Sequence, residues 1–478
     1  MTSAPPASVG ERTTGRGLDL VAITAVALIV RLPAVFAMRH LHPDDGTYGA
    51  SAVAMRDGGV PFREVFSSQG PLHLPLVYVG DLLGGRTHNS PRVMPLVAGV
   101  AAALLAYLIV RRVGTRTGAL LAGGLLAVTG SMLWTSGPIT SDAPTVAFAL
   151  GALLAALHAR DKPDTTRAIL IGALVAAAML CKIAMGAIAA IPILLLLRRE
   201  RRLLAIAAAT AVIAGIAVTA PFGFSDVWDQ AVRYQLDSER EQSILENLSK
   251  IFTTVSTRDL PVIVAGALAI AAAWWTRRQT DATQREEDAD ALWRAVAIWT
   301  LVIVVFLAIQ PALWRNHLAH LSPGLALLVG LRPPPARWLV AALALVAPIH
   351  VWQSLDILVP PDYGGPTREA YDAIRALPDD AWVISDEVGI VWRAGRRTPD
   401  DFVDASIKQL QQGRVTTDTI VEAASRDEVC GVLVWSARHW GSLPDLPAKL
   451  ADAGYEPTER FFGQDGARVL YERTTCPA

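Results

Sequence analysis

The sequence predicts a polytopic, mainly helical membrane protein with about eleven transmembrane helices and a small C-terminal α/β domain. Of its 478 residues, 52% are hydrophobic and only 18% are charged, whereas a soluble chain carries about 25% charged residues. The apolar residues come in blocks close to the roughly 20 residues that a helix needs to cross the hydrocarbon core of a bilayer. The composition becomes that of a soluble protein only after about residue 355.

The apolar blocks define the expected transmembrane helices. Several are rich in Gly and Ala, which suits close helix packing in lipid. The least certain division separates 168–181 from 183–197, because only a Cys-Lys pair stands between them. The candidate spans are, approximately, 18–38, 93–110, 118–135, 143–159, 168–181, 183–197, 203–221, 259–275, 293–310, 318–331 and 337–355.

The short loops predict the orientation. Alternate loops are rich in Arg or Lys, and the loops between them, such as 135–142, are poorer. By the positive-inside rule the basic loops and the N-terminus are cytoplasmic, and an odd number of spans places the C-terminus outside. The first span has no convincing cleavage site for a signal peptidase, so we expect it to stay in the cell membrane. The basic loops are 111–118, 159–167, 198–202, 277–294 and 332–337.

Three large segments are then expected outside the cytoplasm: 39–92, 222–258 and the tail from 356. The sequence thus divides into a membrane domain, 1–355, and an α/β domain, 356–478. In the first loop, "PLHLPLVYVGDLLGG" is too short to span and predicts a helix along the interface, with Tyr78 at headgroup level. In the tail, "AWVISDE", "CGVLVWS" and "ARVLYER" predict strands, and "TREAYDAIRAL", "TTDTIVEAASRDE" and "LPAKLADAG" predict helices.

Charge and cysteine content exclude some functions. The net charge is −1, and no basic surface indicates a nucleic-acid partner. The three cysteines form no CxxC pair and no zinc-binding spacing with histidine. Cys430 opens one predicted strand of the tail and Cys476 follows the last one. If these strands are neighbours, we expect a disulfide bond between the two cysteines, because the tail lies where oxidation is permitted.

Two adjacent carboxylates, Asp44 and Asp45, follow the first span in "HPDDGTYGASA". Pro, Asp and Gly also cluster in solvated turns, which is the structural alternative. The position favours a role in a site, because this loop returns to the membrane surface. Adjacent carboxylates in a partly desolvated site either hold a cation or divide into a base and a supporting acid. Tyr48 and the returning "SSQGPLHLPL" stretch would shield the pair from water.

The order of the motifs resembles a known family. An arginine in span one is followed by "PDDGTYGASAVAMRDGGVPFREVFSSQGPLHLPL", "SPRVMPLVAG", "TSDAPTVAFA", "MLCK" and "RNHLAHLSPGLALL". Over about residues 20–335 this order is similar to that of the integral-membrane glycosyltransferases of the C-type fold (glycosyltransferase family 39 type), such as protein O-mannosyltransferases and aminoarabinose transferases. Two positions depart from the family pattern: Asp45 replaces a glutamate, and the neutral Gln69 stands where a charged residue is frequent.

The resemblance implies transfer of a sugar from a polyprenyl-phosphate donor to an acceptor hydroxyl on an envelope glycan, lipid or protein, with inversion, at the outer membrane face. It implies Asp44 as general base and Asp45 as supporting acid or metal ligand. If a divalent metal ion is required, Asp45 and Asp142 are its candidate ligands. The sugar, the acceptor and the metal requirement stay open. The alternatives are a membrane transporter and a non-catalytic envelope-assembly protein.

Three further charged residues lie in or beside spans. Arg31 is inside span one and either faces a polar cavity, supporting the site, or extends to the interface. Asp142 opens a span in "TSDAPT" and is either a first-turn acid or, by the resemblance, a carboxylate near the catalytic one. Lys182 lies between two spans and either binds the donor phosphate as a point charge or extends to the interface.

The remaining phosphate candidates lie at the expected outer face. Arg92 opens the second span, and "WRNHLAHLS" supplies Arg315, His317 and His320. On a helix, His317 and His320 would share a face, whereas Arg315 and His317 would not. The resemblance assigns this cluster to the donor site, although histidines in such places are frequently structural. Tyr48 and Gln69 are expected to support the site.

Overall fold

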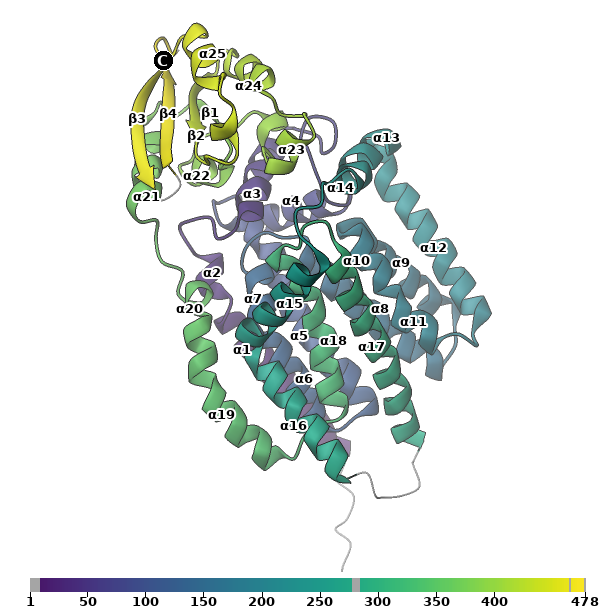
Figure 1. Cartoon of the computed structure of the whole chain (residues 1–478). Helices are drawn as coiled ribbons and strands as arrows, with labels where there is room; N and C mark the ends of the chain where they lie inside the picture. Colours follow the sequence, from purple (N-terminus) through teal and green to yellow (C-terminus); the bar gives the residue numbers. More distant parts are fainter. Residues whose placement is uncertain (1–8, 277–283, 464–465, 477–478) are drawn as a thin grey trace, which may run out of the picture.

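The computed structural model describes residues 9–276, 284–463 and 466–476. A bundle of helices carries a small α/β domain on one end (Figure 1). The helices before this domain are α1 (Val9–Ile29), α2 (Leu32–Val35), α3 (Pro43–Arg56), α4 (His73–Leu83), α5 (Val93–Val113), α6 (Arg116–Val128), α7 (Gly130–Ser136), α8 (Asp142–Asp161), α9 (Thr165–Cys181), α10 (Ile183–Ile188), α11 (Ala190–Leu196), α12 (Arg201–Thr219), α13 (Phe224–Val227), α14 (Tyr234–Leu236), α15 (Ile244–Arg258), α16 (Leu260–Thr276), α17 (Gln284–Ile309), α18 (Leu321–Leu331), α19 (Ala336–Gln353) and α20 (Leu355–Leu358).

Within the described ranges, five helices are long and apolar enough to cross a membrane, or up to seven if each bent pair counts as one span. The chain is therefore a multi-pass membrane protein, but fewer helices than the eleven expected spans meet these criteria of length and composition. The bent pairs are α6 with α7, at 56°, and α15 with α16, at 94°. Three further apolar stretches, α4, α9 and α10–α11, are shorter.

The difference in span number has local causes. The expected span 18–38 is broken, because α1 ends at Ile29 and α2 begins with Pro33 in its first turn. The expected span 118–135 bends at Thr129, where Gly130 approaches the carbonyl oxygen of Arg258. The expected break at Lys182 is present between α9 and α10. Residues 277–283 of the expected loop 277–294 lie outside the described part of the chain.

Arg31 ties these broken helices together. Its side chain is buried, and its Nε donates to Ser136 Oγ at 2.7 Å. Its Nη1 donates to the carbonyl oxygens of Ala27 and Ala127, at 3.0 and 2.7 Å. The arginine thus faces the interior and joins the ends of α1, α6 and α7, where the bends leave backbone carbonyl groups free to accept hydrogen bonds.

The C-terminal domain (residues 365–476) contains a four-stranded sheet of order β1-β2-β4-β3. β1 and β2 are parallel, and β4 pairs antiparallel with both β2 and β3. β3 was not predicted, because it is an edge strand that carries Pro457 and several charged residues. The elements are α21 (Gly365–Ala376), β1 (Trp382–Ser385), α22 (Val388–Arg393), α23 (Ile407–Gln411), α24 (Thr417–Ala424), β2 (Val429–Val434), α25 (Leu446–Asp452), β3 (Tyr455–Gly463) and β4 (Gly466–Arg473).

A disulfide bond joins Cys430, in β2, to Cys476, just after β4, with their Cα atoms 5.4 Å apart. The neighbouring positions of β2 and β4 in the sheet bring the two residues together. The third cysteine, Cys181, is buried and free. The bridge therefore fixes the end of the chain to a central strand of the domain.

The C-terminal domain rests on α3, the helix that carries the two adjacent aspartates (Figure 1). A Cβ atom added to Gly46 of α3 would lie 2.5 Å from the Cα of Gly389 in α22, so the two backbones touch at this point. Gly49 is likewise covered by the indole ring of Trp392. Tyr48, Trp392 and Val403 belong to one buried apolar cluster. The loop after the first membrane helix is thus enclosed between the bundle and the domain.

Candidate active site

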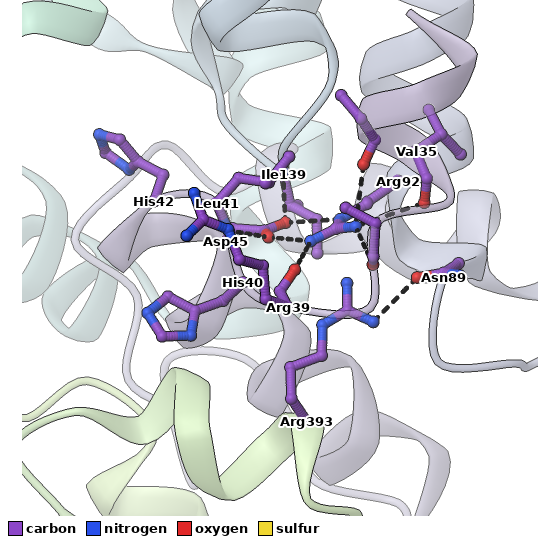
Figure 2. A network of polar contacts seen from close by, with 12 residues as sticks. Val35, Arg39, His40, Leu41, His42, Asp45, Asn89, Arg92, Ile139 and Arg393 are labelled. Atoms are coloured by element: carbon purple, nitrogen blue, oxygen red, sulfur yellow. Dashed lines mark hydrogen bonds and ion pairs between the residues drawn. The ribbon is translucent and has the colours of Figure 1, made fainter. Parts of the chain in front are cut away.

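The two adjacent aspartates lie in different environments. Asp45 is fully buried, and both of its carboxylate oxygens are taken (Figure 2). Oδ1 accepts from Arg92 Nε at 3.1 Å and from the Ile139 amide at 2.9 Å. Oδ2 accepts from Arg92 Nη2 and from the Leu41 amide at 3.0 Å. Burial alone raises the pKa of Asp45, but the charge and hydrogen bonds of Arg92 outweigh it and lower the pKa to about 2.

Arg92 has no N–H group left for a phosphate. Its side chain is fully buried, and besides Asp45 it donates to backbone carbonyl oxygens only. Its Nη1 contacts the carbonyls of Ala34, Val35 and Ala37, and its Nη2 contacts that of Arg39 at 2.7 Å. Arg92 therefore anchors the backbone between α2 and α3, and its engaged N–H groups do not fit the phosphate contact that the sequence led us to expect.

Asp44 is partly exposed, whereas Asp45 is fully buried. About a third of the Asp44 side chain is exposed (33%). Its Oδ2 accepts a hydrogen bond of 3.0 Å from Asn316 Nδ2, and its backbone N–H donates to the ring of His42, the N-cap residue of α3. The position in the first turn of a helix favours a negative charge, because the helix dipole is positive at this end. Asp44 is thus an ionisable group that solvent and a ligand can reach.

Asp142 contacts two other candidate residues, Lys182 and His320, and also Asn316. Its fully buried carboxylate accepts from Lys182 Nζ at 2.6 Å and contacts His320 Nε2 at 2.9 Å, both on Oδ1. Asn316 Nδ2 approaches its Oδ2 at 3.4 Å. Lys182 therefore faces the interior, because the break between α9 and α10 turns it toward α8. Asn316, which the sequence did not single out, connects Asp142 with Asp44.

The side chains beside the two aspartates that come from α3, α4 and the loop between them are uncharged. Tyr48 is buried with its ring edge against His73, the ring centroids being 4.3 Å apart. Burial, followed by the charges of Asp44 and Asp404, holds the pKa of Tyr48 well above its usual value, so the phenol stays protonated. Gln69 accepts a hydrogen bond of 2.9 Å from Ser141 Oγ. These contacts connect the loop after α3 to the start of α8.

The expected Arg315, His317 and His320 cluster is divided. These residues lie in a 3₁₀ helix, Arg315–His320, and not in an α-helix. His320 contacts Asp142 directly, whereas His317 makes its hydrogen bond elsewhere, with Nδ1 2.8 Å from Gln310 Oε1. Arg315 is exposed. The structure therefore brings Asp44, Asp142, Lys182 and His320 together, with His317 close enough for the charges of Lys182 and Asp142 to act on it, and leaves Arg315 to the side.

The chemistry of the donor set does not fit a bound metal ion. Asp45 uses both oxygens on Arg92 and backbone amides, and Asp142 already contacts an ammonium group and a histidine. Across the described ranges, no group of three or more His, Cys, Asp or Glu side chains is placed to hold a metal ion. We therefore assign no step to a metal.

Comparison with known proteins agrees with this architecture. Residues 68–224 match the family described as dolichyl-phosphate-mannose-protein mannosyltransferase. No curated protein sequence matches the chain. Among solved structures, the chain is similar to apo ArnT from Cupriavidus metallidurans, with a TM-score of 0.66, 16% identity and coverage of 96% of this chain and 98% of that chain.

Two further structures have the same fold. ArnT from Cupriavidus metallidurans bound to undecaprenyl phosphate matches with a TM-score of 0.64 and 17% identity, over 96% of this chain and 98% of that one. The apo oligosaccharyltransferase of Archaeoglobus fulgidus matches with a TM-score of 0.57 and 14% identity, over 95% of this chain and 74% of that one. The resemblance seen in the motif order is thereby confirmed: the chain has the fold of ArnT and of the archaeal oligosaccharyltransferase, and residues 68–224 match the mannosyltransferase family.

Proposed function

We propose that the chain transfers a sugar from a polyprenyl-phosphate donor to an acceptor hydroxyl at the outer face of the cell membrane. The fold and the match over residues 68–224 support a membrane glycosyltransferase. The structure of a similar protein with undecaprenyl phosphate supports a lipid phosphate as the carrier. The basic loops support a cytoplasmic N-terminus and an outside C-terminal domain. The acceptor hydroxyl belongs to an envelope glycan, a lipid or a protein.

The contrast between Asp44 and Asp45 carries this proposal. A catalytic site frequently holds two carboxylates whose environments assign them different tasks. Asp45 is saturated by Arg92 and backbone amides, so it stays ionised and structural. Asp44 is accessible and held by one amide, so it is free to take a proton from the acceptor hydroxyl. When the acceptor oxygen attacks the anomeric carbon directly while a single base takes its proton, the configuration of that carbon is inverted.

The leaving phosphate needs a positive charge, because negative charge develops on it as the glycosidic bond breaks. Lys182 supports this role, since its ammonium group lies beside Asp142 and His320 and is connected to Asp44 through Asn316. Asp142 orients the lysine and His320. The neutral Gln69 and protonated Tyr48 supply hydrogen-bonding groups without adding negative charge near the phosphate.

Mass spectrometry of lipid-linked sugars and envelope glycans tests the proposal. A strain that lacks the protein should accumulate one polyprenyl-phosphate sugar and lose one glycan modification. The wild-type chain should restore the modification, and Asp44→Asn at equal abundance should not. An unchanged glycan profile in the deletion strain, with no accumulated donor, would contradict the proposed transfer. Restoration by Asp44→Asn would instead favour a non-catalytic role in envelope assembly.

A further inference from the structure

The cations around the site differ in their partners. Arg92 is paired with Asp45, and Lys182 is paired with Asp142. Lys408, in α23 of the C-terminal domain, makes no ion pair with any residue in the described part of the chain, although it is only partly exposed. A partly desolvated ammonium group without a counterion gains more from a bound anion than one that is already paired.

A chain of hydrogen bonds connects Lys408 to the site. Its Nζ donates to Gln235 Oε1 at 3.1 Å, and Gln235 Nε2 donates to the Ser68 carbonyl at 3.0 Å. Ser68 directly precedes Gln69, which accepts from Ser141 Oγ at 2.9 Å. One hydrogen bond uses only one of the three donors of the ammonium group. Lys408 therefore lies near the loop that carries Gln69. Because Gln69 is neutral, it supplies no positive charge of its own.

The segment around Lys408 is fixed in place. Val403 is fully buried in the cluster that contains Tyr48. Asp404 Oδ1 accepts from the amide of Ser406 at 3.1 Å, and Ser406 Oγ lies 2.9 Å from the hydroxyl of Tyr234. A second contact to the same loop comes from Gln412, whose Nε2 donates to the Tyr234 carbonyl at 2.9 Å. The lysine is thus held at the site by the docked domain.

The charges around Lys408 agree with this placement. Burial lowers the pKa of the ammonium group first. Glu241, Asp404 and Asp44 raise the pKa, whereas Lys182 lowers it. The charges of the proposed base, Asp44, and of the proposed phosphate-binding Lys182 therefore both act on Lys408. This agrees with a position of Lys408 at the same site.

We propose that Lys408 binds the phosphate of the polyprenyl carrier together with Lys182, so that the C-terminal domain completes the donor site. This proposal rests on the proposed function, because it takes the lipid phosphate as the ligand. It gives the domain a direct part in binding the donor: the site gains a cation without an ion-pair partner only when the domain is docked on α3. Lys408 is accordingly a substrate-binding residue and not a base.

Binding of undecaprenyl phosphate, compared with uncharged undecaprenol, tests this proposal on the purified full-length chain. The wild-type protein should bind the phosphate more tightly than the alcohol. Lys408→Gln should weaken phosphate binding by about 10- to 100-fold, because a hydrogen bond to a charged group is lost. The same variant should leave undecaprenol binding unchanged. Lys408→Arg should keep most of the phosphate affinity.

A matched control comes from the same domain. Lys449, on α25, is paired with Asp418, on α24, so Lys449→Gln removes the same charge elsewhere and should leave phosphate binding unchanged. Lys408→Met, which keeps the aliphatic stem, replaces the glutamine variant if that one unfolds. Equal phosphate affinity in the wild-type chain and either uncharged variant would overturn the role of Lys408. Equal affinity of the wild-type chain for phosphate and alcohol would instead overturn the proposed function.

Discussion

The side-chain amide of Asn316 donates a hydrogen bond of 3.0 Å to Oδ2 of Asp44, across 272 residues of sequence. The same amide approaches Asp142, so one residue of the 3₁₀ helix orients two carboxylates. Within the described residues, Oδ1 of Asp44 accepts no hydrogen bond. The amide therefore fixes the direction of the proposed base and leaves one oxygen for the acceptor hydroxyl.

Replacing Asp44 by Asn removes the proton acceptor and keeps the shape of the side chain. We expect sugar transfer to fall by about 10²–10⁴-fold, the usual contribution of a general base. Undecaprenyl phosphate binding and thermal stability should change little, because the Asp44 side chain is one-third exposed and an asparagine oxygen still accepts the hydrogen bond of Asn316. Transfer rates of the purified protein, measured with saturating donor and acceptor, check this expectation. The exposed Asp380→Asn is the control, and a wild-type rate in Asp44→Asn would exclude the residue as the base.

Asp45→Asn should lower the stability of the folded chain. The substitution leaves the buried guanidinium of Arg92 without its counterion, which costs about 3–5 kcal/mol in the free energy of unfolding. We expect a lower melting temperature and less folded protein in the membrane. Added divalent metal ions should not restore activity, because no ligand role is lost. Rescue by metal ions would show that Asp45 binds one and would require a different arrangement of the loop.

The same ion pair predicts a dependence of stability on pH. The pKa of Asp45 is lowered to about 2 in the folded chain, from an ordinary value near 3.8. A lowered pKa stabilises the fold above the unfolded pKa, by roughly 2 kcal/mol here, and this stabilisation is lost as pH falls from about 4 toward 2. Melting temperatures should therefore drop more steeply over this range in the wild-type protein than in Asp45→Asn. An equal fall of the melting temperature with pH in both proteins would contradict the lowered pKa of Asp45.

Gly46→Ala tests the contact between α3 and the C-terminal domain. Alanine favours a helix over glycine by about 1 kcal/mol, so a harmful effect must come from the collision of its Cβ with Gly389. We expect lower activity and faster proteolysis of the C-terminal domain. Gly215→Ala, in α12, is the matched control, because an added Cβ there meets no atom within 4 Å. Equal protease resistance of both variants would argue against tight docking.

The disulfide between Cys430 and Cys476 should stabilise the C-terminal domain. It closes a loop of 46 residues, which corresponds to at most about 4 kcal/mol in the chain-entropy account. We expect Cys476→Ser to lower the unfolding temperature of the domain under oxidising conditions. Under reducing conditions the variant and the wild-type protein should unfold at similar temperatures. Alkylation of both cysteines in native, unreduced protein after denaturation would show that the bridge does not form.

Local patterns predicted most of the membrane helices, three of the four strands and the segments that carry the site, but they did not predict the helices α3, α15, α22 and α23. Apolar blocks report burial in lipid, and the motif order gave the resemblance and the positions of Asp44, Asp142 and Lys182. The number of eleven spans is not confirmed, because apolar composition does not reveal where a helix breaks. The strand β3 was missed, since an edge strand tolerates proline and charge.

The roles of individual side chains depended on contacts that no local pattern contains. Arg92 was expected at the donor phosphate, but its partner is Asp45, 47 positions away. Asn316 lay between two named residues and carried no distinguishing pattern, yet it alone contacts both Asp44 and Asp142 among the described residues. Lys408 belongs to a domain of soluble composition, and only the docking of that domain brings it beside the loop that carries Ser68 and Gln69.

The backbone contact between Gly46 and Gly389 sets an order of assembly during synthesis. The helix with Asp44 emerges from the ribosome early, whereas α22 and α23 follow after all the membrane helices. In the proposed topology, the C-terminal domain must cross the bilayer and dock on Gly46 before Lys408 can join Asp44 and Lys182 at the site. Catalytic competence would then arise only at the end of translation, so a prematurely terminated chain would occupy the membrane without consuming the lipid carrier.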